Sequence, residues 1–257
     1  MNINNQTLSS ELQARGAVLV GFGDLGALPA DVREGLPVGV SVAVKYPKDV
    51  IRGIAELPTK EYFEWYNRLN EKLDELVAYG VDFIILHGYR AVALTRAYLS
   101  SGASGITSGG APGSSASNDA AYRMTGGGVP DYGIKLPHKT VATRAGIGWI
   151  GKCALLVTKE YGSMVRLSSI LTDAPFECAA PVDTSLCGDC SACADACPAK
   201  AVSGKHWYAG LARDEFFNAA ACGAAARERS MQGFGGGATI CGKCIEVCPF
   251  TRIYMNS

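Results

Sequence analysis

The first 180 residues alternate between short apolar runs and a segment with helical periodicity. Residues 17–22 and 38–46 are continuous apolar runs, the second rich in β-branched valine, and both predict buried strands. Between residues 59 and 80, apolar side chains recur at helical spacing while charged residues occupy the opposite face. The sequence therefore predicts a long amphipathic helix that starts at Thr59 and ends at Gly80.

Further predicted elements continue this alternation as far as residue 172. The predicted strands cover residues 81–86, 153–158 and 164–172, and the predicted helices cover residues 91–99 and 138–145. An alternation of this kind is typical of a sheet covered by helices. We therefore expect an α/β (α+β) domain over residues 1–180.

Residues 100–130 interrupt the pattern, because they are rich in Gly, Ser and Ala. A loop of this length inside a compact domain is usually functional or disordered. Two interpretations stay open, a surface insertion and a lid or loop that contacts a cofactor.

The last third of the chain carries two cysteine runs that each end in Cys-Pro. The first has the form C-x2-C-x2-C-x3-C-P and the second the form C-x2-C-x3-C-P, with one isolated cysteine between them. Their cysteines are Cys187, Cys190, Cys193 and Cys197, then Cys222, then Cys241, Cys244 and Cys248. This spacing is typical of a protein that holds two [4Fe–4S] clusters, in which the fourth cysteine of a run binds the other cluster.

The exchange of the fourth cysteine gives a specific assignment of ligands. Cluster one takes Cys187, Cys190, Cys193 and Cys248, and cluster two takes Cys197, Cys222, Cys241 and Cys244. A pair of zinc sites is the alternative, since zinc also binds Cys-x2-Cys pairs. Cys153 and Cys178 fall outside the eight, and we expect them to behave as small buried hydrophobic residues.

Composition adds little beyond the metal site. Lys plus Arg and Asp plus Glu both number 24, so the formal charge is zero, which gives no support to a nucleic-acid or membrane-surface partner. No run of about 18 apolar residues is present, and the N-terminus lacks the pattern of a signal peptide. Ten cysteines in such a chain predict a reducing cytoplasm, in an anaerobic or oxygen-protected cell.

The residues before and within the first cysteine run resemble a known family. Arg144 to Lys152 reads RAGIGWIGK, Tyr161-Gly-Ser follows, and Ile170-Leu-Thr-Asp173 precedes the cysteines. This combination resembles epoxyqueuosine reductase, a family with distant similarity to reductive dehalogenases. The resemblance implies a nitroreductase-like domain (residues 1–180) that holds a corrinoid (cobalamin), fused to a ferredoxin-like two-cluster domain (residues 181–257). Electrons would pass through the clusters to cobalt, and the cofactor would carry out the reduction.

The resemblance also implies site residues. The family's proton-donor aspartate falls near Asp131, Tyr132 and His138, and any of the three is a candidate acid. The candidate corrinoid contacts are Lys139, Arg144, Gly148, Trp149 and Lys152. Solvated surface charge is the alternative for the three cations, and a place in the core is the alternative for Trp149.

The sequence departs from this family after the second cysteine run, where it stops nine residues beyond Cys248. Family members that act on tRNA continue into a helical-repeat domain, so we expect a small-molecule substrate and no tRNA partner. A reduced ferredoxin or flavodoxin is the expected electron donor. Two alternatives stay open, a flavin (FMN) in place of the corrinoid and an electron-transfer protein that reduces a partner corrinoid or flavoprotein.

Overall fold

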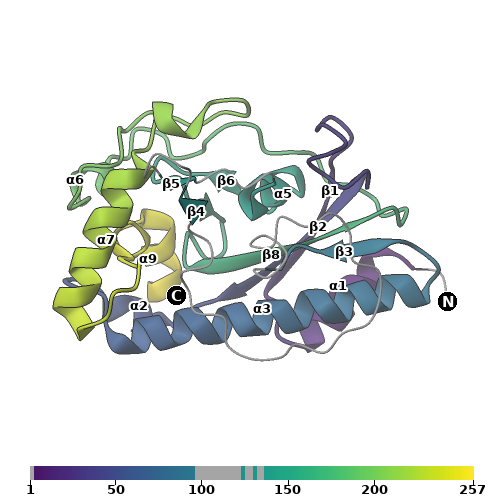
Figure 1. The fold of residues 1–257 in the computed structure, drawn as a ribbon, viewed down its shortest axis with the longest axis horizontal. Coiled ribbons are helices and arrows are strands. Elements are labelled where there is room, and N and C mark those ends of the chain that lie inside the picture. Colours follow the sequence, from purple (N-terminus) through teal and green to yellow (C-terminus); the bar gives the residue numbers. More distant parts are fainter. Residues whose placement is uncertain (1–2, 96–122, 125–129, 132–135) are drawn as a thin grey trace.

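The computed structural model describes residues 3–95, 123–124, 130–131 and 136–257 of the 257 residues. Its centre is a four-stranded antiparallel sheet in the order β1-β2-β8-β3 (Figure 1). The strands are β1 (Leu19–Asp24), β2 (Val38–Lys45), β3 (Ala91–Ala93) and β8 (Val165–Thr172). The mixed architecture expected from the sequence is confirmed, with an antiparallel sheet.

Helices cover both faces of this sheet. Helices α1 (Asn5–Ala14) and α3 (Lys60–Leu86) lie on one face, and the short helix α5 (His138–Arg144) lies on the other (Figure 1). The hydroxyl of Thr59 accepts a hydrogen bond from the Tyr62 N–H, which fixes the start of α3 as expected.

Three of the predicted elements are wrong. Gly80 does not end α3; a side chain there would lie 2.5 Å from the Ile170 methyl group, so this glycine allows close contact between helix and sheet. The helix therefore continues through residues 81–86, which we expected to be a strand. Residues 91–93 form strand β3 where we expected a helix, because their backbone pairs with the edge of β8. The strand expected over residues 153–158 is reduced to β7 (Leu156–Val157), which pairs with β6 (Trp149–Ile150).

The cysteine-bearing last third of the chain consists of helices joined by long connections. These are α6 (Ala192–Asp195), the 3-10 helix η2 (Arg213–Glu215), α7 (Ala219–Phe234), α8 (Lys243–Glu246) and α9 (Pro249–Asn256). The remaining elements are α2 (Lys48–Arg52), β4 (Arg123–Met124) and β5 (Pro130–Asp131).

The main hydrophobic core crosses the expected domain boundary at residue 180. It is built on the sheet and α3, and it also contains Ile240, Ile245 and Met255 from the region of the second cysteine run. A smaller cluster consists of Ile150, Ala154, Trp207 and Phe216. The two predicted domains are thus joined by a shared core, and the boundary at 180/181 stays a prediction.

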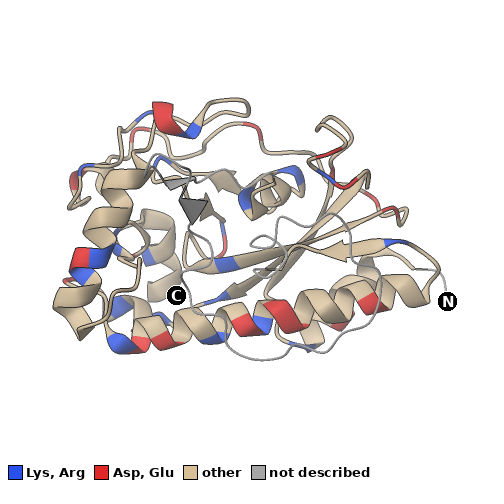
Figure 2. Cartoon of the chain, viewed as in Figure 1, with Lys and Arg blue, Asp and Glu red and all other residues tan. Residues whose placement is uncertain are grey.

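Charged residues of both signs alternate along the exposed face of α3 (Figure 2). Among the described residues, no helix combines the length and the apolar character needed to cross a bilayer.

Candidate iron–sulfur site

Five cysteines from the two runs line one cavity. The cavity has a volume of about 100 Å³ and lies between the β6–β7 hairpin and the two runs. Its wall includes Cys187, Cys190, Cys193 and Cys248, the four thiols assigned to cluster one. Cys248 is distant in sequence from the other three, so the fold brings the two runs together as the exchange rule requires. The ligand roles themselves stay predictions.

A second group of thiols surrounds the N-terminal half of α7. Burial and, to a smaller extent, the neighbouring thiols of Cys197 and Cys241 raise the pKa of Cys222 to about 11. These three were all assigned to cluster two. The fourth, Cys244, borders the first cavity, so it lies between the two groups.

Two of the sulfurs accept hydrogen bonds from nitrogen donors. The indole Nε1 of Trp149 lies 3.4 Å from the sulfur of Cys187, and the Ala201 N–H lies 3.3 Å from the sulfur of Cys197. Donors of this kind stabilise thiolates and the added charge of a reduced cluster. Trp149 is fully buried and packs edge-to-face on Phe250, with ring centroids 4.9 Å apart.

The first turn of α9 points donors at Cys248. Burial raises the pKa of Cys248, whereas the N–H groups of Thr251 and Phe250 and the Thr251 hydroxyl lower it. Pro249 begins this helix directly after the cysteine, which directs the free N–H groups of the first turn toward the sulfur. The thiols, their number and these donors fit a thiolate-bound cluster.

Lys152 holds the first cysteine run in place. Its side chain is buried, and its Nζ donates to the carbonyl oxygens of Gly188 and Cys190, both at 2.9 Å. A buried ammonium beside the cluster cavity also places a positive charge where electrons are to be stored.

Two further residues that we expected to contact the corrinoid are Lys139 and Arg144. Lys139 donates to the Ala154 carbonyl, and burial lowers the pKa of its ammonium to about 8. Arg144 lies 3.7 Å from the carboxylate of Asp183. That Lys139 and Arg144 contact a corrinoid stays a prediction.

Gly148 and Trp149 are both packed closely inside the protein. A Cβ at Gly148 would overlap the Val157 carbonyl, so this glycine is required for close packing of the β6–β7 hairpin. Trp149 has no exposed face to offer, because it is buried between the hairpin and α9. The place in the core, left open from the sequence, is the one that Trp149 occupies.

Of the three candidate acids, the structure gives side-chain contacts only for His138. His138 begins α5, its Nδ1 lies 3.0 Å from the Ser169 hydroxyl, and burial together with nearby Arg166 lowers its pKa to about 4. Its imidazole is therefore neutral at pH 7. Asp131 belongs to β5 through its backbone pairing with Arg123, and Tyr132 lies outside the described residues. Most of the loop expected at residues 100–130 also lies outside them.

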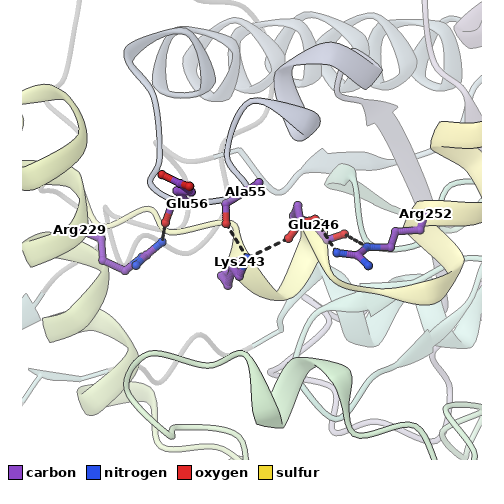
Figure 3. Close-up of polar contacts among 6 residues, drawn as sticks. All are labelled: Ala55, Glu56, Arg229, Lys243, Glu246 and Arg252. Atoms are coloured by element: carbon purple, nitrogen blue, oxygen red, sulfur yellow. Dashed lines mark hydrogen bonds and ion pairs between the residues drawn. The ribbon is translucent and has the colours of Figure 1, made fainter.

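A polar network positions the second cysteine run, and sequence reasoning missed it. Lys243 donates to the Ala55 carbonyl at 2.5 Å and to the Glu246 carboxylate at 3.1 Å (Figure 3). Arg252 binds the same carboxylate at 2.8 Å, and Arg229 donates to the Glu56 carbonyl (Figure 3). The network ties α7, α8 and α9 to residues 55–56, and no sequence motif marks these partners.

The two spare cysteines differ. Cys153 is buried, as expected, but it lines the cluster cavity. Cys178 is exposed, so the prediction that it is buried is wrong.

A known family matches the part of the chain that carries the two cysteine runs. Residues 186–251, which contain all eight candidate ligands, match a family described as a 4Fe-4S double cluster binding domain. This chain thus carries a double-cluster domain, which favours two clusters over the zinc alternative.

Curated relatives match part of the chain. The epoxyqueuosine reductase of Listeria monocytogenes serovar 1/2a is 48% identical over 84 residues, which are 30% of this chain and 22% of that protein. The epoxyqueuosine reductase of Lactococcus garvieae is 50% identical over 64 residues, or 25% of this chain and 18% of that protein. The match thus spans about a fifth of the length of these relatives.

Solved structures match the fold over nearly the whole chain. An epoxyqueuosine reductase with an epoxyqueuosine-modified tRNA-Tyr stem loop has a TM-score of 0.56 at 22% identity, covering 96% of this chain and 65% of that one. A reductive dehalogenase, described with a mechanism for B12-dependent dehalogenation, has a TM-score of 0.63 at 15% identity, covering 97% and 33%.

These relatives overturn one expectation. The prediction that tRNA is not a partner is wrong, because the matched curated proteins are epoxyqueuosine reductases and one solved relative holds a tRNA stem loop. A net charge of zero describes the whole chain and carries no information about a local surface.

The sequence match over part of the chain and the fold match over nearly all of it confirm the predicted resemblance to the epoxyqueuosine reductases, with a likeness in fold to the reductive dehalogenases.

Proposed function

We propose that this protein is an iron–sulfur oxidoreductase that passes electrons through two [4Fe–4S] clusters to a second, bound cofactor. The observation that carries this proposal is the cavity lined by Cys187, Cys190, Cys193 and Cys248, with donors directed at two of these sulfurs. A cluster bound by the first run alone would not require Cys248 of the second run to lie beside it.

The protein's own groups would shape the electron path in three ways. The thiolates hold the clusters, the Trp149 N–H and the α9 N–H groups stabilise the added negative charge, and the Lys152 ammonium does so at longer range. Burial of Trp149 and Val157 keeps water from this side of the cavity. The hydrogen-bond donors and the ammonium favour the reduced, more negative state of cluster one, whereas the exclusion of water opposes it.

The proposed acceptor is a corrinoid in the nitroreductase-like part of the chain. Support comes from the RAGIGWIGK motif and from the likeness in fold to a reductive dehalogenase described as B12-dependent. A corrinoid, when bound, would supply a strongly nucleophilic or reducing cobalt centre. Trp149 is buried in the core, so Lys139, Arg144, Gly148 and Lys152 remain the proposed contacts.

The substrate follows from the relatives. An epoxyqueuosine-modified tRNA stem loop is the first substrate to test, since a solved relative is described with it. A small molecule is the second. A reduced ferredoxin or flavodoxin remains the proposed electron donor.

The experiment is cofactor analysis of protein purified without oxygen. We expect about eight irons per chain, matching sulfide and one cobalt after reconstitution with cobalamin. Flavin absorption with no cobalt would replace the corrinoid by FMN. Rapid oxidation of the clusters by a partner protein, with no turnover of tRNA or small molecules, would favour an electron carrier. An iron content below four per chain would overturn the proposal.

A further inference from the structure

Arg166 is a half-buried cation with no negatively charged partner among the described residues. It lies near the start of β8, and its guanidinium carbon is 4.2 Å from the ring centroid of Tyr66 on α3. Its printed hydrogen bonds both go to the neutral amide oxygen of Asn70, also on α3. Removing a guanidinium from water is costly unless an opposite charge compensates it. A negative charge is therefore missing at this place.

The aromatic residues around Arg166 do not supply this charge. Burial raises the pKa of Tyr46 to about 12, so its phenol is neutral at pH 7. The face of the Tyr66 ring attracts the cation through its quadrupole, but it carries no net charge.

The hydrogen bonds to Asn70 use only one edge of the guanidinium. Nε and Nη2 of Arg166 donate to Oδ1 of Asn70 at 3.1 Å and 2.7 Å. A guanidinium presents five N–H donors in a planar fork, so the edge formed by Nη1 and Nη2 is left for a second acceptor. That edge matches two oxygens of a carboxylate or a phosphate, which accept two parallel hydrogen bonds from it.

Asn70 contributes an unsatisfied donor beside this cation. Its side chain is buried, with 4% of the residue exposed, and its Nδ2 has no hydrogen-bond partner in the described part of the chain. The guanidinium has no acceptor, so it can bond only to the amide oxygen, which fixes the end of the amide that carries Nδ2. A buried N–H without a partner is costly, so an acceptor oxygen is also missing here.

The sheet leaves the neighbourhood of Arg166 accessible. Strand β3 pairs with residues 170–172 at the other end of β8, and no other described strand pairs with this edge of β8 beside Arg166. The charge of Arg166 also reaches His138, where it adds to the effect of burial in lowering the pKa of the imidazole. An anion bound to Arg166 therefore lies near one of the candidate acids.

We propose that Arg166 and Asn70 form a binding site for a small molecule that carries an oxyanion, either a carboxylate or a phosphate. Nη1 and Nη2 of Arg166 donate to two oxygens of the anion, and Nδ2 of Asn70 donates to an oxygen of the same group. The anion supplies both the charge and the acceptor that the described residues lack. Neither residue is among the eight candidate ligands, so the site is independent of the clusters.

A purely structural role for Arg166, as a link between β8 and α3, predicts that no anion binds. Asn70→Asp separates the two roles, because a carboxylate at residue 70 supplies the missing charge from within the chain. The new carboxylate pairs with the guanidinium and removes the donor Nδ2, so it prevents an external anion from binding. The guanidinium and its packing on Tyr66 are kept in this variant.

The experiment titrates inorganic phosphate and, separately, acetate into the full chain purified without oxygen, with binding measured by calorimetry. The wild type is compared with Asn70→Asp, Arg166→Met and, as a matched control, Arg68→Met. Arg68 also lies on α3 over an aromatic ring, that of Trp65 at 5.5 Å, but it is exposed. We expect the wild type and Arg68→Met to bind at one site, and the affinity to fall by about tenfold or more in the other two variants. The probe that binds more tightly identifies the anionic group.

Two results would overturn the inference. One is no binding of either probe to the wild type at tens of millimolar, and the other is an unchanged affinity in Asn70→Asp. An equal loss of affinity in Arg68→Met would contradict it as well, since the effect would then come from net charge. If Arg166→Met does not fold, Asn70→Asp decides the question alone. A low iron content in the wild type would count against the proposed function and leave the anion titration as the test of this site.

Discussion

The two cysteine runs have the same chemistry but are held by the protein in different ways. Helix α6 of the first run buries no side chain, whereas α8 of the second run buries Ile245 and Glu246. The second run is also continuous with the main core through Ile240 and Met255. The first run, residues 187–197, contributes no residue to the main core, and the Lys152 ammonium binds two of its carbonyl oxygens.

This difference indicates how each run stays folded. Burial of apolar surface stabilises the second run whether or not a cluster is bound. The first run has few such contacts, so its order depends more on ligation and on one buried cation. Replacing a ligand or a cation in each run tests this contrast.

Removing one ligand from each set should remove one cluster. In Cys187→Ala and in Cys222→Ala we expect the iron content to fall from about eight to about four per chain, because a cluster lacking one of four thiolates is lost. Metal analysis checks this, with Cys178→Ala as the control that retains all the iron. Full iron in Cys222→Ala would show that the isolated cysteine is not a ligand.

Replacing the cation that holds each run should affect the first run more. Lys152→Met removes two charge-assisted hydrogen bonds and should cost about 3 kcal/mol of stability. Lys243→Met should cost about 1 kcal/mol, because Glu246 keeps Arg252 as a partner. Urea unfolding followed by cluster absorption measures both; equal losses would contradict the contrast between the runs.

The sheet half should respond to acid through His138. Burial lowers its pKa from 6.5 to about 4, so between these values the unfolded chain binds a proton that the folded chain does not. Stability is therefore present above pH 6.5 and lost as the pH falls, by roughly 2 kcal/mol between pH 7 and pH 5. Chemical unfolding at several pH values checks this, and His138→Gln should reduce the loss by that amount. An unchanged pH dependence in this variant would rule out His138 as its source.

The smallest effect concerns the donor to Cys187. Trp149→Phe keeps the ring contact with Phe250 but removes the N–H, so the potential of cluster one should fall. We expect about 1 kcal/mol, or a fivefold shift of the reduction equilibrium. Redox titration measures it, and a shift confined to the other cluster would place Cys187 in the wrong set.

The sequence predicted those parts of the molecule that local spacing controls. The cysteine spacing led to the double-cluster domain, and the valine-rich run led to β2. The end of α3 was not predictable from local signals, because Gly80 serves contact with Ile170 and not a turn. Strand β3 was missed because its structure depends on pairing with β8.

In the candidate site, too, local spacing predicted some residues, and contacts between distant parts of the chain determined the others. Spacing predicted the eight thiols that the fold gathers, but the partners of Lys152 and Lys243 are distant in sequence and carry no motif. Cys153 was interpreted as a small hydrophobic residue because its position gives no spacing signal. Only the folded β6–β7 turn places it at the cluster cavity.

Electron paramagnetic resonance of the fully reduced wild-type protein, with iron counted on the same sample, tests whether eight thiolates hold two clusters side by side. We expect about eight irons per chain and a spectrum broadened by magnetic interaction between two neighbouring reduced clusters. About four irons per chain, with the signal of a single isolated cluster, would contradict it.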